Sequence, residues 1–371
     1  MLLYVFIIFI LFFILIFGLQ QPCSVKKELV ISHGKKIQDK QNKNYSVSCS
    51  TAVSFAALLI LWFLTAFRAD SIGNDTGNYI YYFNAIRLSG IDSAYRIEYG
   101  YQIFCYIVGI FTDNAHVFIA ICATVCYLSV GIYIWKYSLN RCISTVLVFA
   151  LLFSVFTNTL RQDIAMVICL YAYEALKKHR KIVCLILIVI ASTFHVSALI
   201  CLVWFFYKLL CVKKSYILFL CGALIFGCVT GIFESVIGFI FAQYRGYFNG
   251  QYAGTGWLAV SADCLRALCI YLFIASAYRK KTYITKIITA NSAALLLLSC
   301  LGYMVNLFTR AAQYFLISAI VELPNAYYFS RIKDKKLFLI TFCLCCLMYF
   351  LVAIIFRPEW NHLYPYEFFW S

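Results

Sequence analysis

Charged residues and prolines are scarce in this sequence. Of the 371 residues, 12% are charged, 64% are hydrophobic and only 4 are proline. Soluble domains carry roughly 25% charged and about 45–50% apolar residues, so this composition excludes an ordinary water-soluble globular protein. The shortage of proline, with no tract rich in serine and glycine, also argues against long linkers or disordered tails.

Metal-ligand motifs are missing as well. The 18 cysteines lie mostly inside apolar runs, where a thiol usually acts as a small hydrophobic group. No Cys-x-x-Cys pair lies near a histidine at metal-ligand spacing, and we expect the cluster of Cys343, Cys345 and Cys346 only to fill a helix. The sequence therefore predicts no metal site, and we expect no cofactor.

Lysine is missing from every second connection between the apolar stretches. All nineteen lysines fall in six short segments: 20–46, 136–141, 177–181, 208–214, 279–286 and 330–336. By the positive-inside rule these segments are cytoplasmic. The net charge of +16 would suit a nucleic-acid partner, but lysines spread over six loops on one side fit membrane orientation better, and we expect no nucleic acid.

The opposite face has arginine without lysine. Eight of the twelve arginines lie outside the lysine segments: Arg68, Arg87, Arg96, Arg161, Arg245, Arg266, Arg310 and Arg357. Loop orientation alone does not choose between arginine and lysine. Recognition of a planar or bidentate anion, such as phosphate or carboxylate, favours arginine.

The apolar stretches predict an all-α fold, a polytopic membrane bundle that forms one domain over residues 1–371. A helix needs about 20 apolar residues to cross a bilayer. Alternation of the loops gives about twelve segments, with both termini outward, near 2–19, 47–67, 115–135, 142–159, 162–177, 182–195, 196–210, 215–234, 259–278, 286–308, 311–329 and 337–356. Residues 2–19 lack a basic start and a small-residue cleavage site, so we interpret residues 1–46 as a retained helix followed by a basic cytoplasmic loop.

Several segments are too short for a simple crossing, and two outer segments are long. Residues 68–114 and 235–258 exceed the length of a hairpin, and 101–112 are predicted to be an interfacial or re-entrant helix. Residues 182–210 are predicted to be two half-depth helices that meet in a turn at His195. The tyrosines of these outer segments suit either a plain interfacial belt or an aromatic platform for sugars, and composition does not decide.

The outer segment 68–114 contains three candidate site residues. Arg68 and Asp75 follow a hydrophobic span and flank a turn-prone Gly-Asn-Asp, and Glu98 lies further along the same loop. An arginine near the membrane needs partners, since at a helix centre it costs roughly 2.5–3.5 kcal/mol on insertion scales. Each carboxylate could also belong to a solvated, charge-balanced loop.

Three further arginines lie at or inside apolar spans. Arg161 and Gln162 open a span within the polar string TNTLRQD, where an interfacial snorkelling arginine is the alternative. Arg266 lies one helical turn from Asp263, so an ion pair is predicted. Such a pair could be purely structural, but intramembrane charges usually line a cavity. Arg310 lies at the outer junction of two spans, where a helix-end anchor is the alternative.

His195 lies at a polar helix break, in the string STFHVSA. It could be a buried hydrogen-bonded residue, a general base or a phosphate contact, because imidazole ordinarily titrates near neutral pH. Together these residues predict an outward-facing cavity lined by arginines, a few carboxylates, one histidine and many tyrosines. Such a cavity suits an anionic, partly sugar-like substrate with a lipid tail.

The order of these motifs resembles the EpsG family of exopolysaccharide polymerases, part of the broader group of Wzy-type polymerases. The resemblance covers most of the chain from about Trp62. It rests on Arg68 with Gly73-Asn74-Asp75 and Tyr79, Glu98-Tyr99-Gly100-Tyr101, Arg161-Gln162 with Ala165, Phe194-His195 with Ser197-Ala198, Arg310 with Tyr314-Phe315, and Pro365-Tyr366. The sequence departs from the family where the usual Glu-Pro-Gly-Tyr reads EYGY.

The resemblance implies a multi-pass glycosyltransferase of the bacterial inner membrane with GT-C-like architecture. Its substrates would be oligosaccharide repeat units linked to undecaprenyl pyrophosphate, joined on the outer face into exopolysaccharide, capsule or O-antigen without a metal. A chain-length regulator is a candidate partner. From the lysine-free set of arginines we expect Arg161, Arg266 and Arg310 to bind the donor pyrophosphate, with support from Arg68. Gln162, Tyr101 and Tyr314 are expected to make other substrate contacts, and His195, Glu98 or Asp75 is expected to supply the base.

Two other functions remain open from the sequence. One is a flippase for lipid-linked oligosaccharides, although transporters tend to have paired repeats and helices broken by glycine or proline near the midplane. This sequence shows neither clearly. The other is a ligase that moves finished glycan onto a lipid or protein acceptor.

Overall fold

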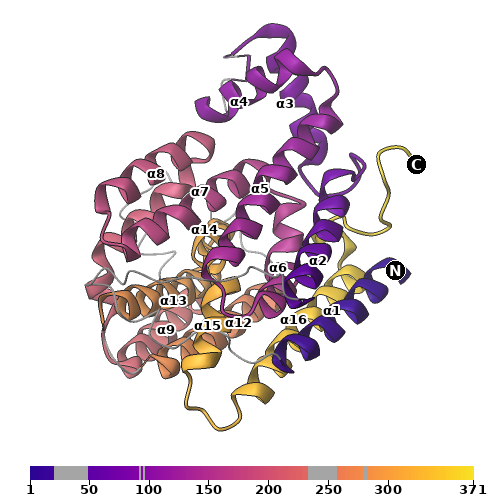
Figure 1. The fold of residues 1–371 in the computed structure, drawn as a ribbon. Coiled ribbons are helices and arrows are strands. Elements are labelled where there is room, and N and C mark those ends of the chain that lie inside the picture. The colour runs from indigo at the N-terminus through magenta and orange to yellow at the C-terminus, as the bar shows by residue number, and fades with distance from the viewer. Residues whose placement is uncertain (21–48, 92, 95–96, 233–256, 279–281) are drawn as a thin grey trace, which may run out of the picture.

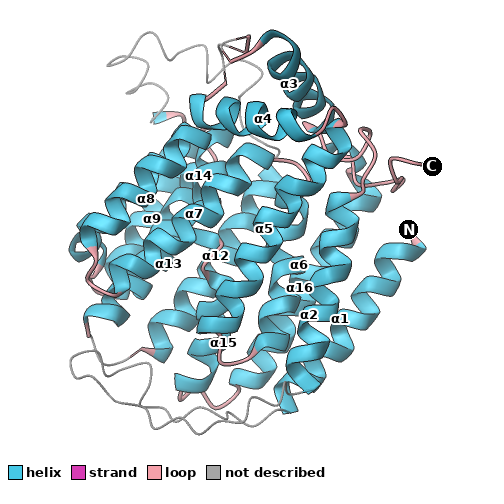
Figure 2. Cartoon of the chain, turned by 45° about the horizontal axis from the view of Figure 1, so that its top comes forward, coloured by secondary structure: helices cyan, strands magenta, loops and turns pink. Residues whose placement is uncertain are grey.

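A computed structural model describes residues 1–20, 49–91, 93–94, 97–232, 257–278 and 282–371 of the chain (Figure 1). In this part of the chain the regular elements are helices and no strand occurs (Figure 2), as the all-α prediction requires. Nearly all of the basic loop 20–46 and of the outer segment 235–258 lies outside the described residues, as do Arg96 and Arg245.

Apart from α3 and α4, the helices of the first half run between the two ends of the bundle in alternating directions. They are α1 (Leu2–Gln20), α2 (Cys49–Ala66), α3 (Thr76–Ser89), α4 (Tyr99–Phe111), α5 (Ala115–Tyr137), α6 (Arg141–Phe156), α7 (Leu160–Lys177) and α8 (Lys181–Phe194). α3 and α4 cap one end, and α4 lies across it (Figure 2). α4 coincides with the predicted interfacial helix, whereas α3 was not predicted.

The second half continues in the same way. Its helices are η1 (Val196–Leu210), α9 (Lys214–Val229), α12 (Trp257–Ala277), α13 (Tyr283–Leu301), α14 (Asn306–Leu316), α15 (Ala319–Phe329), α16 (Lys335–Phe356) and η3 (Pro358–Trp360). The described turns that contain lysine all join helices at the end opposite α3 and α4. The chain is thus a helical, multi-pass membrane protein, and its described lysines gather at one end.

Five described helices, α1, α5, α12, α13 and α16, are long and apolar enough to cross a membrane. Six shorter apolar helices accompany them, so the total of about twelve crossings stays a prediction. α8 and η1 meet at His195, as predicted. η1 is a 3₁₀ helix of 15 residues with a kink at Phe206, and the half-depth position of the two helices stays a prediction.

One predicted boundary is wrong. The break between the segments 286–308 and 311–329 falls earlier, at Gly302–Val305, and α14 then runs through Arg310 without interruption. Arg310 is therefore inside a short helix rather than at a junction of two spans. The charge is tolerated there because α14 presents its polar residues to a cavity.

Two glycines allow close approaches at the outer end. Gly73 has a positive φ of 86°, and a side chain there would overlap the carbonyl oxygen of Thr157 at the end of α6. A side chain at Gly100 would overlap Thr193 near the end of α8. Glycine at these positions lets the α2–α3 turn sit on α6, and α4 sit on α8.

The chain after α16 folds back over the outer end, and both termini lie at that end (Figure 1). The backbone N–H of Ala69 donates to Glu367 at 3.0 Å, and that of Gly73 donates to His362 at 3.0 Å. The hydroxyl of Tyr4, at the start of α1, donates to the carbonyl of Leu363 at 2.8 Å. The outward orientation of both termini stays a prediction.

Candidate functional site

Three predicted site residues meet at the outer end. Glu98 precedes α4, Arg161 lies in the first turn of α7, and His195 separates α8 from η1. Oε1 of Glu98 lies 2.9 Å from Nδ1 of His195 and accepts the backbone N–H of Val196 at 3.1 Å. Oε2 of Glu98 pairs with the guanidinium of Arg161. We call Glu98, Arg161 and His195 the acid–base cluster.

The acid–base cluster keeps Glu98 ionised. Burial raises the pKa of Glu98, but the hydrogen bond from His195 and the charge of Arg161 outweigh it and lower the pKa to about 2. An ionised carboxylate only accepts hydrogen bonds, so Nδ1 of His195 must be the donor. In the neutral ring, Nε2 then carries the lone pair, and His195 is oriented as a base. The side chains are about a fifth exposed, so a solute can reach them.

Tyrosines pack behind the acid–base cluster. Tyr79 of α3 lies against Arg161, and its buried hydroxyl has a pKa raised chiefly by burial. Its ring centroid lies 6.2 Å from that of Tyr101. Tyr101 is 0% exposed, so it supports the cluster from within and has no open face here. Its substrate contact stays a prediction.

Asp75, the third candidate base, is placed differently. It precedes α3, is partly exposed, and accepts a hydrogen bond from the amide of Asn78 at 3.4 Å. It lies one helical turn before Tyr79. No contact with Glu98 or His195 is found in the described part of the chain.

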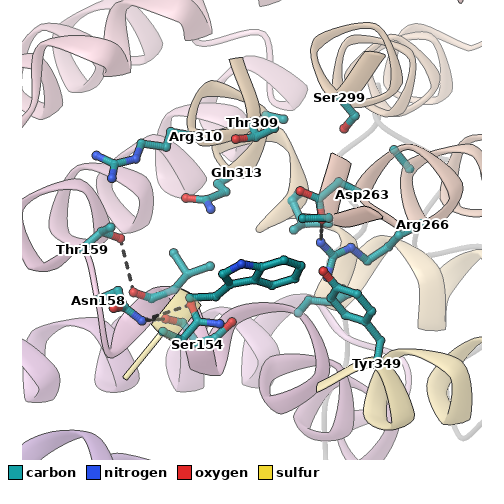
Figure 3. A pocket seen from close by; sticks show the side chains of 18 of the residues that line it. Ser154, Asn158, Thr159, Asp263, Arg266, Ser299, Thr309, Arg310, Gln313 and Tyr349 are labelled. Atoms are coloured by element: carbon teal, nitrogen blue, oxygen red, sulfur yellow. Dashed lines mark hydrogen bonds and ion pairs between the residues drawn. The ribbon is translucent and has the colours of Figure 1, made fainter. Parts of the chain in front are cut away.

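A polar cavity of about 310 Å³, lined by none of the three cluster residues, reaches the start of α7 at Thr159. Its lining includes Asp263 and Arg266 of α12, Thr309, Arg310 and Gln313 of α14, Ser154, Asn158 and Thr159 at the end of α6, Ser299 of α13 and Tyr349 of α16 (Figure 3). Arg266 pairs with Asp263, as predicted. Arg310 lies on the opposite side of the cavity (Figure 3).

The guanidinium of Arg310 is available to a ligand. Its side chain is exposed, and among the described residues it has no hydrogen bond or ion pair. Gln162 holds this part of α14 in place: its Nε2 donates to the carbonyl of Arg310 at 2.9 Å and to Oε1 of Gln313 at 2.8 Å. Of two consecutive residues of α7, Arg161 thus belongs to the acid–base cluster and Gln162 contacts the helix that lines the cavity.

α14 also links the cavity to the acid–base cluster. The hydroxyl of Tyr314 lies 3.0 Å from that of Ser197, two residues after His195. Tyr314 is 1% exposed, so it fixes α14 against η1 and does not line the cavity.

Sequence reasoning missed the contribution of the C-terminal residues to the cavity. Trp360 and Asn361 line it. The amide of Asn74 donates to the carbonyl of Trp360 at 2.8 Å, and the backbone N–H of Asn74 donates to Asn158. The only signal in the sequence was the run of aromatic residues after the last apolar span.

Arg68 is not at the cavity. It is 0% exposed, and its Nε donates to Thr76 at 3.1 Å while NH1 donates to the carbonyl of Thr65. Asp163, also 0% exposed, lies near enough to interact electrostatically with it. Because the side chain of Arg68 lies inside the bundle, it does not reach the cavity that Arg266 and Arg310 line.

The sequence predicted one cavity lined by the arginines, whereas the structure has two sites. Arg161 belongs to the acid–base cluster, whereas Arg266 and Arg310 face the polar cavity. Both sites lie at the lysine-free end. In the described residues, no three His, Cys, Asp or Glu side chains gather as a metal site.

Comparison with known proteins gives one family match. The model of the EpsG family matches residues 51–368, which include both sites. No curated protein and no solved structure matches this chain.

Proposed function

Because the chain belongs to the EpsG family, which is tied to exopolysaccharide synthesis, we propose that it is a glycosyltransferase that polymerises repeat units. Its substrates are oligosaccharides linked to undecaprenyl pyrophosphate. It joins them on the outer face of the bacterial inner membrane into exopolysaccharide, capsule or O-antigen.

The observation that carries this proposal is an oriented histidine linked to a cavity with two arginines, through the contacts of Ser197 with Tyr314 and of Gln162 with Arg310. An acceptor sugar hydroxyl gives its proton to Nε2 of His195 while its oxygen bonds to the anomeric carbon of the donor. The bond between that carbon and the pyrophosphate breaks, and the pyrophosphate leaves with the electron pair, still attached to its lipid. Glu98 stabilises the protonated imidazole.

The cavity supplies the other half of the reaction. The pyrophosphate gains negative charge as it leaves, and Arg310 and Arg266 stabilise that charge. Arg266 shares its charge with Asp263, so Arg310 is the stronger contact. Amides of Gln313 and Asn158 and the ring of Trp360 suit the sugar hydroxyls and the sugar face.

A change at Arg310 tests the proposal. We expect Arg310→Ala to shift the glycan ladder on a gel from long chains to single repeats. Arg310→Lys should restore only part of the length, because an ammonium does not bind pyrophosphate bidentately. Arg331→Ala is the matched control, since Arg331 is an exposed arginine at the lysine-rich end. Wild-type ladders in both Arg310 variants, at normal expression, would remove Arg310 from the reaction.

A deletion strain separates the other functions. A strain without the polymerase accumulates single repeat units on the outer face. Accumulation on the inner face would instead identify a flippase, and long unattached glycan would identify a ligase.

A further inference from the structure

A second, apolar groove runs along the side of the bundle between α12 and α16. Its volume is about 610 Å³. Leu265 and Cys269 of α12 face Leu337, Thr341 and Cys345 of α16 across it. Leu265 and Leu337 are 62% and 64% exposed, so the groove opens sideways, toward the space that membrane lipid occupies.

The groove exists because the two helices pack on different neighbours. α12 packs on α13 and α15, and α16 packs on α1 and α6. The two meet near the lysine-rich end, where the rings of Phe273 and Phe338 stack with centroids 4.5 Å apart. The groove runs past that contact, from Ile332 and Asp334 at the lysine-rich end to Tyr349.

The outer end of the groove joins the polar cavity. Arg266 and Tyr349 line both, and Figure 3 shows the two side chains together at one side of the cavity. From Leu337 to Tyr349 the groove follows twelve residues of α16, about 18 Å at 1.5 Å per residue. An apolar slot of this length thus ends at a guanidinium.

We infer that this groove holds the isoprenoid chain of the lipid-linked pyrophosphate substrate, with the first isoprene units beside Tyr349 and the pyrophosphate at Arg266. The inference rests on the proposed function. A molecule with a long apolar chain joined directly to an anion matches an apolar slot joined directly to an arginine-lined cavity. The sideways opening lets the chain enter from the membrane without leaving it.

Arg266 also distinguishes this occupant from an ordinary phospholipid. It lies nine residues inside α12, about 14 Å along the helix from Trp257. A phospholipid keeps its phosphate at the membrane surface, whereas the joined cavity offers polar lining at this depth. A second copy of the chain could cover the groove, but it would not account for the connection of the groove to the polar cavity at Arg266 and Tyr349.

Photo-crosslinking tests the inference on the full-length protein in lipid nanodiscs. The probe is a polyprenyl pyrophosphate with a diazirine in its first isoprene units. We expect its label on peptides of α12 and α16 that contain Leu265, Cys345 or Tyr349, and loss of that label when unlabelled polyprenyl pyrophosphate competes. Label spread over the whole lipid-facing surface, or label that only phospholipid displaces, would overturn the inference.

A matched pair of variants provides a second measurement. Thr341→Trp fills the groove, whereas Met348→Trp adds the same ring to the same helix at a residue that is 55% exposed and outside the groove. We expect Thr341→Trp to raise KM about tenfold for a long-chain donor and to leave a short-chain (geranyl) donor unchanged, since a uniform binding contact is lost. Equal KM values in wild type and Thr341→Trp for the long-chain donor would overturn the inference.

The two proposals fail separately. Specific label in the groove without polymerisation of repeat units would retain the lipid groove and remove the polymerase. Polymerisation with label elsewhere would retain the polymerase and remove the groove.

Discussion

Glu98 shows how one carboxylate fixes the chemistry of its neighbours. It accepts from His195, Val196 and Arg161, and its pKa near 2 makes it a poor base at neutral pH. In the proposed reaction the base is therefore His195 rather than Glu98, and Glu98 orients the imidazole.

Glu98→Gln tests that division of roles. The amide keeps the shape of the side chain but removes the charge that stabilises protonated His195. We expect the polymerisation rate to fall roughly 10²–10⁴-fold, the usual contribution of a positioned base. His195→Ala should cost a similar factor, and the double variant should cost no more than the single ones, because residues that act as a unit are not additive. Full additivity in the rates would contradict the pairing.

The ion pair of Glu98 has a defined pH range. Its pKa is lowered from 4.5 to about 2, so its contribution to stability is fully present above about pH 4.5 and is lost as pH falls toward 2. The difference in thermal unfolding temperature between wild type and Glu98→Gln should persist from pH 7 to 5 and shrink below pH 4.5. A difference that shrinks between pH 7 and 6 would show that Glu98 titrates there.

At the scale of single elements, the position of α4 depends on a glycine, which has no side chain to keep α4 away from α8. Gly100 lets α4 approach Thr193, two residues before His195, and so brings Glu98 to the imidazole. Gly77 of α3 is a matched control, because a side chain there would meet nothing within 4 Å.

We expect Gly100→Ala to push α4 away and to destabilise the protein by about 1–3 kcal/mol, the usual cost of overpacking. Polymerisation should fall with it. Gly77→Ala should be neutral or slightly stabilising, since alanine suits a helix better than glycine by about 0.5–1 kcal/mol. Thermal unfolding and the glycan ladder measure both effects, and equal behaviour of the two variants would show that the approach of α4 to α8 is not needed.

The other end of α7 contains a buried charge network. Lys177 pairs with Glu174 and, at 2.8 Å, with Glu322 of α15. Its side chain is only 12% exposed, so this lysine of the predicted loop 177–181 holds two helices together. The hydroxyl of Tyr133 on α5 donates to Glu174 at 2.7 Å.

Removal of Lys177 should be costly. Lys177→Met leaves two carboxylates without their cation, and breaking a buried pair in this way destabilises by about 3–5 kcal/mol. Lys178→Met is the control, because Lys178 is exposed. Comparison of their unfolding temperatures in detergent checks the prediction, which fails if the two variants unfold alike.

For the whole molecule, the C-terminal residues complete a cavity built mostly by helices far earlier in the chain. Trp360→Ala should shorten the glycan, because the cavity loses an aromatic wall against which a sugar can pack. Trp370→Ala is the control on the same tail, since Trp370 is 56% exposed and outside the cavity lining. Unchanged glycan length in Trp360→Ala would remove this residue from substrate binding.

The sequence predicted the features that depend on local composition. Lysine segregation predicted the alternation of the helices, and the spacing of Asp263 and Arg266 predicted their ion pair. The sequence could not predict that Arg161 and Arg310 belong to different sites. That outcome depends on which way each side chain points from its helix, α7 or α14. The role of Trp360 depends on a fold-back of the tail by backbone hydrogen bonds, which leave no pattern in the residue types.

The adjacency of Arg161 and Gln162 has an evolutionary consequence. Arg161 belongs to the acid–base cluster and Gln162 anchors the helix of Arg310, so any tilt of α7 displaces both sites together. Variation that adapts such an enzyme to new repeat units should therefore spare the start of α7 and accumulate at the cavity wall, where Trp360 and Asn361 can change without disturbing the alignment.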